Sequence, residues 1–276
     1  MKNLTKYTNW LKNRNLASET IRTYLWTVSR YKLKLTTSKI SQFLKNQVAK
    51  YQTWTIRNQR NALHSYAKFK KLQVDWELIA RVIPKVQAKF YATITRKELE
   101  KLKEISWKAN GSSKESQRIS ERNNLMLDFL FYTGIRVKEL VNIRHSDWEG
   151  NQLRVWGKGN KIRYVFIPDF LSKYFQPHSN SYLFLTRNSN KLKDTQVRII
   201  INRKVERAKI NKNITPHTFR RSFATLLNNK GCQLTTIQKL LGHSHITTTA
   251  QYIHNDYETL FKDYSKLWKV ENVLSP

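Results

Sequence analysis

Apolar residues in the first third of the chain recur at spacings of three and four, which predicts amphipathic helices. The stretch SETIRTYLWTVSRYKL (18–33) is the clearest example, and Ser18 is expected to be its N-cap. Its apolar face consists of Ile21, Tyr24, Leu25, Val28 and Tyr31. Further helices are expected near 38–50, at about 54–71 and over 76–82. Their inward-facing residues are predicted to be Ile40, Phe43, Leu44, Val48, Trp54, Leu63, Tyr66 and Ala67. This spacing favours core packing over base stacking for the aromatic residues.

The pattern changes after Pro84. The stretch PKVQAKFYATIT (84–95) has little periodicity and is predicted to be a linker. Thr95 and Glu98 then form a Thr-x-x-Glu capping box, which predicts the start of a new helix. The polar run 108–123 is expected to be a loop that leads into an apolar helix over 125–132.

A Gly-containing turn follows this helix and precedes a second amphipathic helix, with Val137, Leu140 and Val141 inward. The segment QLRVWGKGNKIRYVFIP (152–168) alternates apolar and polar residues on both sides of Gly-Lys-Gly-Asn, which predicts a β-hairpin. From 195 onward the pattern is helical again, apart from the approach ITPHTF. We therefore expect a mainly α protein with a small antiparallel β-sheet. We predict two domains, 1–88 and 95–276, joined by a linker at 89–94.

The charge balance of the chain indicates what kind of partner it binds. The chain has 51 Lys and Arg against 19 Asp and Glu, a formal net charge of +32, and its first 90 residues contain only Glu19, Asp75 and Glu77 as acids. Such a surface predicts a polyanionic partner, because each neutralised phosphate releases condensed counterions. A ribosomal protein, or a genome that favours Lys and Asn codons, would also give a basic chain. Charge alone does not separate acting on nucleic acid from holding it.

Several compartments are disfavoured by composition. No run of 18 apolar residues is present, which predicts no membrane span, and the N-terminal MKNLTKYTNWLKNRNL lacks the apolar core of a signal peptide. The single cysteine, Cys232, cannot form an internal disulfide. A cytoplasmic location is expected.

Candidate chemistry is concentrated in the second half of the chain. Arg136 follows a Gly turn, Arg220 lies three residues after His217, and Lys158 occupies the predicted hairpin turn. Taken singly, such an arginine is more often a cap or an ion pair, and a turn lysine is more often a solvated charge.

Together with His243 and Tyr252, however, these residues suit a phosphodiester. Two guanidiniums can grip the non-bridging oxygens, and a lysine can protonate a leaving oxygen. Histidines can move protons, and a tyrosine among positive groups can act as a nucleophile.

Four motifs contain these residues: TGIRVKEL (133–140), GKGNKIR (157–163), PHTFRRSFAT (216–225) and LGHSHITTTAQY (241–252). In order and spacing they resemble the motifs of the tyrosine site-specific recombinases, and the Xer-like branch in particular. The resemblance implies that 1–88 is a helical, SAM-like core-binding domain. It likewise implies that 95–276 is a phage-integrase catalytic domain with a C-terminal tail helix.

The resemblance also implies residue roles. Arg136 and Arg220 would clamp the scissile phosphate, Lys158 would protonate the 5′ oxygen, and Tyr252 would form a 3′-phosphotyrosyl bond. The remaining implied roles are proton transfer by His217, a phosphate hydrogen bond from His243 and support of the first arginine by Glu139. The departures are Arg221, where many relatives have histidine, and Phe219 before Arg220.

No cofactor or metal is implied. The implied partner is double-stranded DNA with a specific target site, bound by a homotetramer on two DNA sites. A partner recombinase or an accessory DNA-binding protein would be compatible with this reading, and no membrane is involved. Zinc is disfavoured because Cys232, His243, His245 and His254 show no CxxC or HExxH spacing.

Two rival functions remain at this point. A type IB topoisomerase-like enzyme would share the chemistry without pairing sites, and an accessory DNA-binding protein would have a decayed active site. The tail ETLFKDYSKLWKV has an apolar stripe that can pack on its own domain or on a neighbouring subunit. The stripe consists of Leu260, Tyr264, Leu267 and Trp268.

Overall fold

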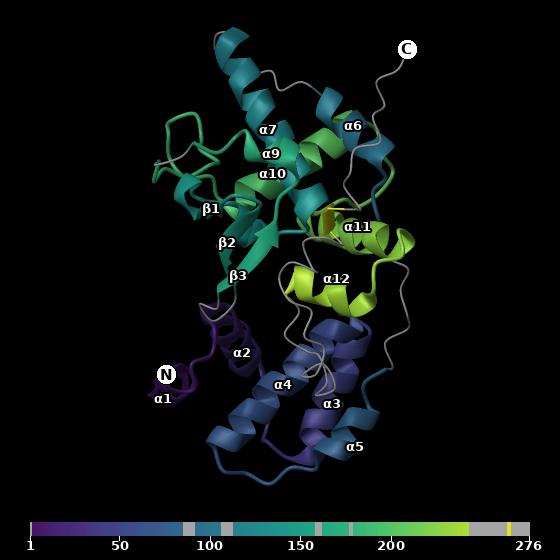
Figure 1. Cartoon of the computed structure of the whole chain (residues 1–276). Helices are drawn as coiled ribbons and strands as arrows, with labels where there is room; N and C mark the ends of the chain where they lie inside the picture. Colours follow the sequence, from purple (N-terminus) through teal and green to yellow (C-terminus); the bar gives the residue numbers. More distant parts are fainter. Residues whose placement is uncertain are drawn as a thin grey trace. The chain divides into compact units, whose positions relative to one another are not determined.

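The computed structural model describes residues 2–84, 92–105, 113–157, 162–176, 179–242 and 264–265. The chain divides into two compact units, Met1–Phe90 and Tyr91–Pro276 (Figure 1). The described part is mainly helical and contains one three-stranded antiparallel sheet, which confirms the predicted fold class.

The first unit is built from helices alone within its described residues. They are α1 (Lys2–Asn13), α2 (Ser18–Arg30), α3 (Thr37–Val48), α4 (Thr53–Phe69) and α5 (Trp76–Arg81). Helix α4 packs against both α2 and α3, so that apolar residues from each element meet around it. One cluster joins Tyr7 and Leu11 of α1 to α2, and the other is centred on Leu44 and Leu63.

Three expectations for this unit are wrong in detail. The N-cap of α2 is Ala17, so Ser18 is the first helical residue. Val48 is exposed because it is the last residue of α3. Trp54 is 68% exposed. Leu63 lies nine positions further along the helix, which is two and a half helical turns and places the two side chains on opposite faces.

The second unit combines helices with the sheet. Its elements begin with α6 (Arg96–Glu104), α7 (Ser113–Thr133), α8 (Val137–Leu140), the 3₁₀ turn η1 (His145–Asp147), β1 (Trp148–Glu149), β2 (Gln152–Trp156) and β3 (Ile162–Phe166). They continue with α9 (Asp169–Ser172), α10 (Asp194–Arg207), α11 (Pro216–Asn229) and α12 (Leu234–Leu241). The predicted capping box at Thr95 is confirmed: the Thr95 hydroxyl accepts from the Glu98 N–H, and the Glu98 carboxylate accepts from the Thr95 N–H.

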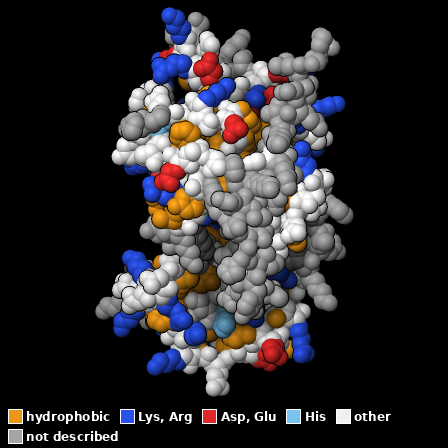
Figure 2. Space-filling model, viewed as in Figure 1, with side chains coloured by type: hydrophobic (Ala, Val, Ile, Leu, Met, Phe, Trp, Pro, Cys, Tyr) orange, Lys and Arg blue, Asp and Glu red, His pale blue; other side chains and the backbone are white. Residues whose placement is uncertain are grey.

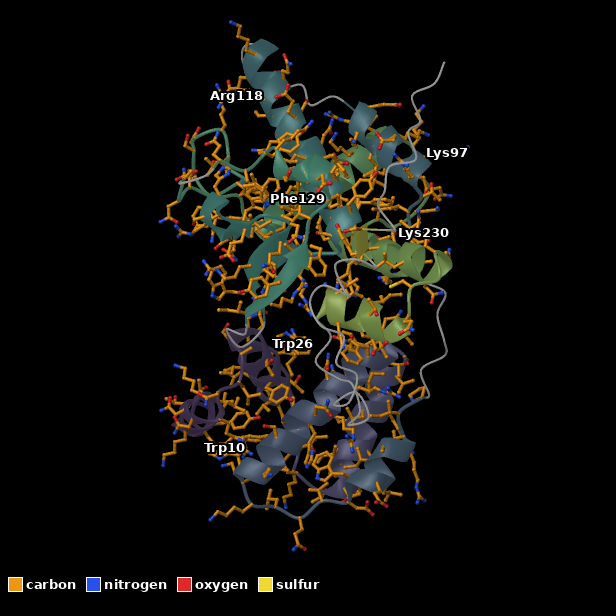
Figure 3. All side chains as sticks on the ribbon, viewed as in Figure 1. Trp10, Trp26, Lys97, Arg118, Phe129 and Lys230 are labelled. Atoms are coloured by element: carbon orange, nitrogen blue, oxygen red, sulfur yellow. The ribbon has the colours of Figure 1, made fainter. Side chains whose placement is uncertain are left out.

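Helix α7 overturns the predicted loop at 108–123, because it begins at Ser113 and runs for 21 residues. The first half of α7 is polar and continues the buried second half. Within this polar half, side chains four residues apart can form hydrogen bonds. Gln117 Nε2 donates to Glu121 Oε1 at 3.0 Å. The second half is core: Phe129 lies inside the unit, whereas Arg118 and Lys97 point outward (Figure 3).

The predicted hairpin is confirmed as β2 and β3, with Arg154 opposite Tyr164 and Val155 opposite Arg163. Leu153, Val155 and Val165 are buried, as period-two alternation requires. The short strand β1 pairs with β2 on its other side.

Helix α11 contacts α7, α10 and α12 and forms the centre of the unit. Phe219 and Phe223 of this helix are buried. Tyr264 is also buried, with its ring 5.4 Å from that of Phe166. This residue of the predicted tail stripe therefore packs against its own unit, while Leu260, Leu267 and Trp268 lie outside the described residues.

The surface reflects the charge of the chain. Figure 2 shows Lys and Arg side chains spread over the visible face and only isolated acidic side chains. In the described part, no helix is both long and apolar enough to cross a lipid bilayer.

Candidate active site

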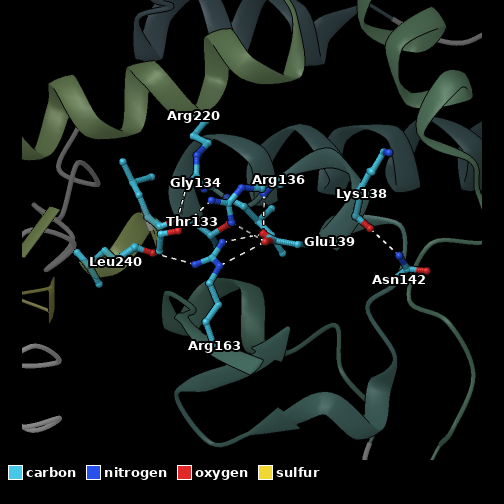
Figure 4. A network of polar contacts seen from close by, with 12 residues as sticks. Thr133, Gly134, Arg136, Lys138, Glu139, Asn142, Arg163, Arg220 and Leu240 are labelled. Atoms are coloured by element: carbon cyan, nitrogen blue, oxygen red, sulfur yellow. Dashed lines mark hydrogen bonds and ion pairs between the residues drawn. The ribbon is translucent and has the colours of Figure 1, made fainter. Parts of the chain in front are cut away.

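Arg136 lies at the beginning of α8, directly after the turn at Gly134. The Glu139 carboxylate accepts a hydrogen bond from the Arg136 backbone N–H at 2.9 Å, which satisfies one of the free amides at the helix start. The same carboxylate binds the Arg136 guanidinium, with 2.8 Å between Nη1 and Oε1. One glutamate thus caps the helix and fixes the arginine (Figure 4).

Glu139 also binds a second arginine, Arg163 of β3. Arg163 Nη2 lies 2.7 Å from Glu139 Oε2, and Nε lies 3.4 Å from Oε1. The Glu139 side chain is only 3% exposed. Burial raises the pKa of this carboxyl, but hydrogen bonds from Arg163 and Arg136 outweigh burial and lower the pKa below its ordinary value. Glu139 is therefore ionised at neutral pH.

The C-terminal end of α12 is the acceptor for three arginines. Its last carbonyls have no partner within the helix and carry the negative end of the helix dipole. Arg163 Nη1 donates to the Leu240 carbonyl at 2.9 Å, and Arg136 Nη2 donates to the Gly242 carbonyl at 2.9 Å. Arg220 Nη2 donates to the carbonyl between them, that of Leu241. Three successive carbonyls thus accept hydrogen bonds from arginines of β3, α11 and the start of α8. Figure 4 shows the first of these contacts, between Arg163 and Leu240.

Arg220 is buried on α11 and reaches across to the turn before α8. Its Nη1 donates to the Gly134 carbonyl at 2.7 Å. Burial and the positive charges of Arg136 and Arg163 lower the pKa of Arg220 to about 9, against the opposing effect of Glu139. The Arg220 guanidinium stays protonated at neutral pH, although the Glu139 carboxylate is bound by Arg136 and Arg163 and not by Arg220. This surplus of positive charge favours an anion beside the cluster.

His217 lies one helical turn before Arg220 on the same helix. Thr215 caps α11 through the Thr218 N–H, and Pro216 is its first residue. Burial lowers the pKa of His217, and the positive charges of Arg221, Arg220, Arg136 and Arg198 lower it further. His217 is therefore a neutral imidazole at neutral pH and can accept a proton.

The structure thus brings together Arg136, Glu139, Arg220 and His217 from among the residues singled out by sequence. Lys158, His243 and Tyr252 lie outside the described residues. Their described neighbours in sequence are Gly157, which follows β2, and Gly242, which belongs to the arginine cluster.

Arg163 was missed by sequence reasoning, although it stands within the motif GKGNKIR. The signal was available: period-two alternation places Arg163 on the same side of β3 as the buried Val165. An arginine on the buried side of a strand requires a partner. Here the partners are Glu139 and the Leu240 carbonyl.

The described residues contain no group of three or more His, Cys, Asp or Glu side chains that could hold a metal ion. Of the four residues weighed as zinc ligands, only Cys232 lies in the described part. The chemistry of the described cluster is that of an anion site with a neutral imidazole on the adjoining helix.

Comparison with known proteins gives consistent results for the sequence and the fold. Residues 92–259 match the Phage integrase family. The tyrosine recombinase XerC of Anoxybacillus flavithermus is 33% identical over 224 residues, which cover 74% of this chain and 72% of that protein.

Solved structures have the same fold. One is the XerH site-specific recombinase bound to a palindromic difH substrate in a post-cleavage complex. It has a TM-score of 0.62 and 23% identity, and the match covers 94% of this chain and 84% of that one. Another is a lambda integrase tetramer bound to a Holliday junction. It has a TM-score of 0.65 and 15% identity, and the match covers 91% and 79% of the two chains.

Proposed function

Because the chain belongs to the phage integrase family, we propose that its arginine cluster holds a DNA phosphate that Tyr252 attacks. The activity is that of a tyrosine recombinase, which cleaves and rejoins DNA strands at a specific site through a 3′-phosphotyrosyl intermediate. The observation that supports these roles is the convergence of Arg136 and Arg220, from α8 and α11, on the last two carbonyls before His243.

Arg136 and Arg220 supply the phosphate clamp in this proposal. A guanidinium has five N–H donors, and within the described residues each of these side chains uses two. The remaining donors can bind the non-bridging oxygens of a phosphate and stabilise the charge that grows there during the reaction. Arg136 is the more accessible, with 37% of its side chain exposed.

The reaction then exchanges one phosphoester for another. The phenolate oxygen of Tyr252 bonds to phosphorus, and the bond from phosphorus to the 5′ oxygen breaks. Lys158 gives its proton to that leaving oxygen, and neutral His217 takes the proton of the tyrosine. His243 donates a hydrogen bond to the phosphate. A 5′ hydroxyl reverses the step, so the phosphoester energy is conserved and no cofactor is consumed.

The partner is DNA. We propose that the DNA carries a specific target site and that four copies of the chain bring two such sites together. A lambda integrase tetramer bound to a Holliday junction has this number of copies. A partner recombinase or accessory protein would fit the same scheme. The division of labour in the chain follows: the helical unit, proposed as residues 1–88, binds DNA, a linker at 89–94 follows, and residues 95–276 carry the chemistry. A cytoplasmic location follows from the need to reach DNA.

A trapped covalent adduct tests the mechanism. Duplexes that bind the full chain are selected from a randomised pool, nicked beside the cleavage position so that the freed fragment diffuses away, and incubated with enzyme. We expect a denaturation-resistant adduct for wild type and for Tyr257→Phe, and none for Tyr252→Phe. An adduct with Tyr252→Phe refutes the assignment of the nucleophile.

The same substrate tests two further parts of the proposal. Adduct formation should persist in EDTA, because arginines supply the charge that a metal would supply. Rejoining between two duplexes should require the selected site on both. Relaxation of supercoiled plasmid without that site would instead indicate topoisomerase-like activity.

A further inference from the structure

Arg136 is held by two acceptors within the described residues, the Glu139 carboxylate and the Gly242 carbonyl. Arg163 binds the first of these acceptors and packs against the residue that carries the second. It forms a two-point contact with the carboxylate, and its side chain lies over Gly242. We propose that Arg163 is a positioning residue for strand cleavage, which fixes the Arg136 guanidinium through Glu139 and the end of α12. This inference rests on the proposed role of Arg136 at the phosphate.

The first connection runs through the carboxylate. Oε1 accepts from Arg136 Nη1 and Arg163 Nε, and Oε2 accepts from the Arg136 N–H and Arg163 Nη2. A planar guanidinium that meets both oxygens fixes the plane of the carboxylate as well as its position. Without Arg163, the carboxylate would keep its hydrogen bonds to Arg136 but lose the second guanidinium that helps to fix its plane.

The second connection runs through the end of α12. Arg163 Nη1 binds the Leu240 carbonyl two residues before Gly242. Gly242 has φ +62°, and a Cβ at this position would lie 2.6 Å from Arg163 Cδ. The Arg163 side chain therefore contacts Gly242 directly. One side chain, that of Arg163, thus contacts this segment both at the Leu240 carbonyl and at Gly242, whose own carbonyl accepts from Arg136.

Burial separates the two arginines by role. The Arg163 side chain is 14% exposed, against 37% for Arg136, and three of its five donors are already used by Glu139 and Leu240. Arg163 is thus suited to acting through Arg136, and Arg136 to meeting a ligand.

The kinetic test compares Arg163→Gln and Arg163→Lys with a matched control, Arg154→Gln. Arg154 belongs to the neighbouring strand β2, so Arg154→Gln removes the same charge from the same sheet as Arg163→Gln does. On the nicked duplex, we expect single-turnover adduct formation by Arg163→Gln to fall about tenfold to a hundredfold, since small misplacement of a binding group costs this much. The DNA dissociation constant should change less than about threefold. Arg163→Lys should recover part of the rate because it can still reach one oxygen. A fall in DNA affinity that accounts for the whole rate loss, or an equal loss in Arg154→Gln, overturns the proposal.

A second measurement does not depend on cleavage. In the full-length protein without DNA, the guanidinium NMR signals of Arg136, assigned by their disappearance in Arg136→Lys, report hindered rotation of the group. We expect slow rotation in wild type and Arg154→Gln and measurably faster rotation in Arg163→Gln, because Arg136 keeps its two acceptors but these are held less firmly. An Arg136 group that stays equally hindered in Arg163→Gln refutes the positioning role. Absence of a covalent adduct with wild-type enzyme would instead refute the proposed function, while this measurement would still decide the role of Arg163.

Discussion

Gly134 occupies the turn between α7 and α8, and replacing it with alanine should destabilise the second unit strongly. Its φ is +60°, in the left-handed region where an L-residue clashes with its own backbone. A Cβ there would also lie 2.5 Å from Phe223 Cδ1 and 3.1 Å from Leu241 Cδ2. Phe223 is buried at the centre of the unit, so its ring cannot swing into solvent.

The magnitude follows from two separable costs. The left-handed backbone costs an alanine about 1–2 kcal/mol. Forcing a methyl group into a packed core costs about 1–3 kcal/mol more. Gly134→Ala should therefore lower the free energy of unfolding by about 2–5 kcal/mol.

The chain provides its own controls for this experiment. Gly150 and Gly231 also have positive φ, +64° and +82°, but a Cβ at either position would meet nothing within 4 Å. Gly150→Ala and Gly231→Ala should therefore show the backbone cost alone, about 1–2 kcal/mol. Urea unfolding of the full chain, followed by circular dichroism, gives the three free energies from midpoints at a common slope.

The difference between Gly134→Ala and the two controls isolates the contact with Phe223. If all three variants lose the same free energy, the reasoning from close packing is refuted, because the core then absorbs the methyl group without cost. A large loss in all three would show instead that the backbone cost had been underestimated.

Three further predictions concern titrating groups. Arg221→Gln removes a positive charge near His217 and should raise the pKa of that histidine towards its ordinary value. The acidic limb of the pH profile of adduct formation should then move to higher pH, and a limb that does not move would show that His217 does not cause it. Glu139→Gln should lower the free energy of unfolding by about 3–5 kcal/mol at pH 7. Because the pKa of Glu139 is lowered in the folded chain, the difference in free energy of unfolding between wild type and Glu139→Gln should become smaller as the pH falls below about 4.5. A difference in urea midpoints that does not change with pH would contradict this prediction. Lys204→Met removes the donor from three acceptors of the buried Lys204 ammonium, the Leu102 and Ile105 carbonyls and Asn124 Oδ1, and should cost about 2–4 kcal/mol. Burial lowers the pKa of Lys204 to about 8 in the folded chain, so between pH 8 and 10.5 the unfolded wild-type chain binds more protons than the folded one. The loss of stability in Lys204→Met should therefore grow over this range, and thermal melts in which the loss shrinks would refute the lowered pKa of Lys204.

The features predicted correctly from sequence are those with local causes. The Thr95 capping box depends on residues three positions apart, and the β2–β3 hairpin depends on alternation around one turn. The polar half of α7 was missed because its helical state depends on the buried half that it extends. Trp54 was misplaced because its apolar character was weighed without its angle relative to Leu63.

The candidate site divides in the same way. Arg136, Arg220 and His217 were singled out because residue type and motif spacing indicate phosphate chemistry, and the structure places them close together. The acceptors that hold the arginines were not predictable, because Gly134, Leu240 and Gly242 contribute backbone carbonyls, which every residue has. Arg163 was hidden because its role depends on contacts between strand β3 and helix α12.

The arginine cluster joins parts of the chain that are made at different times. Its hydrogen bonds connect residues 77, 86 and 106 positions apart, and α12 leaves a ribosome after every other element named above. The first 90 residues, by contrast, already carry 19 Lys and Arg when they emerge, a charge that attracts polyanions. A nascent or truncated chain that ends before α12 is therefore a polycation that lacks the acceptors of the proposed phosphate clamp. In the proposed function, the order of synthesis therefore separates affinity for DNA from the capacity to cut it.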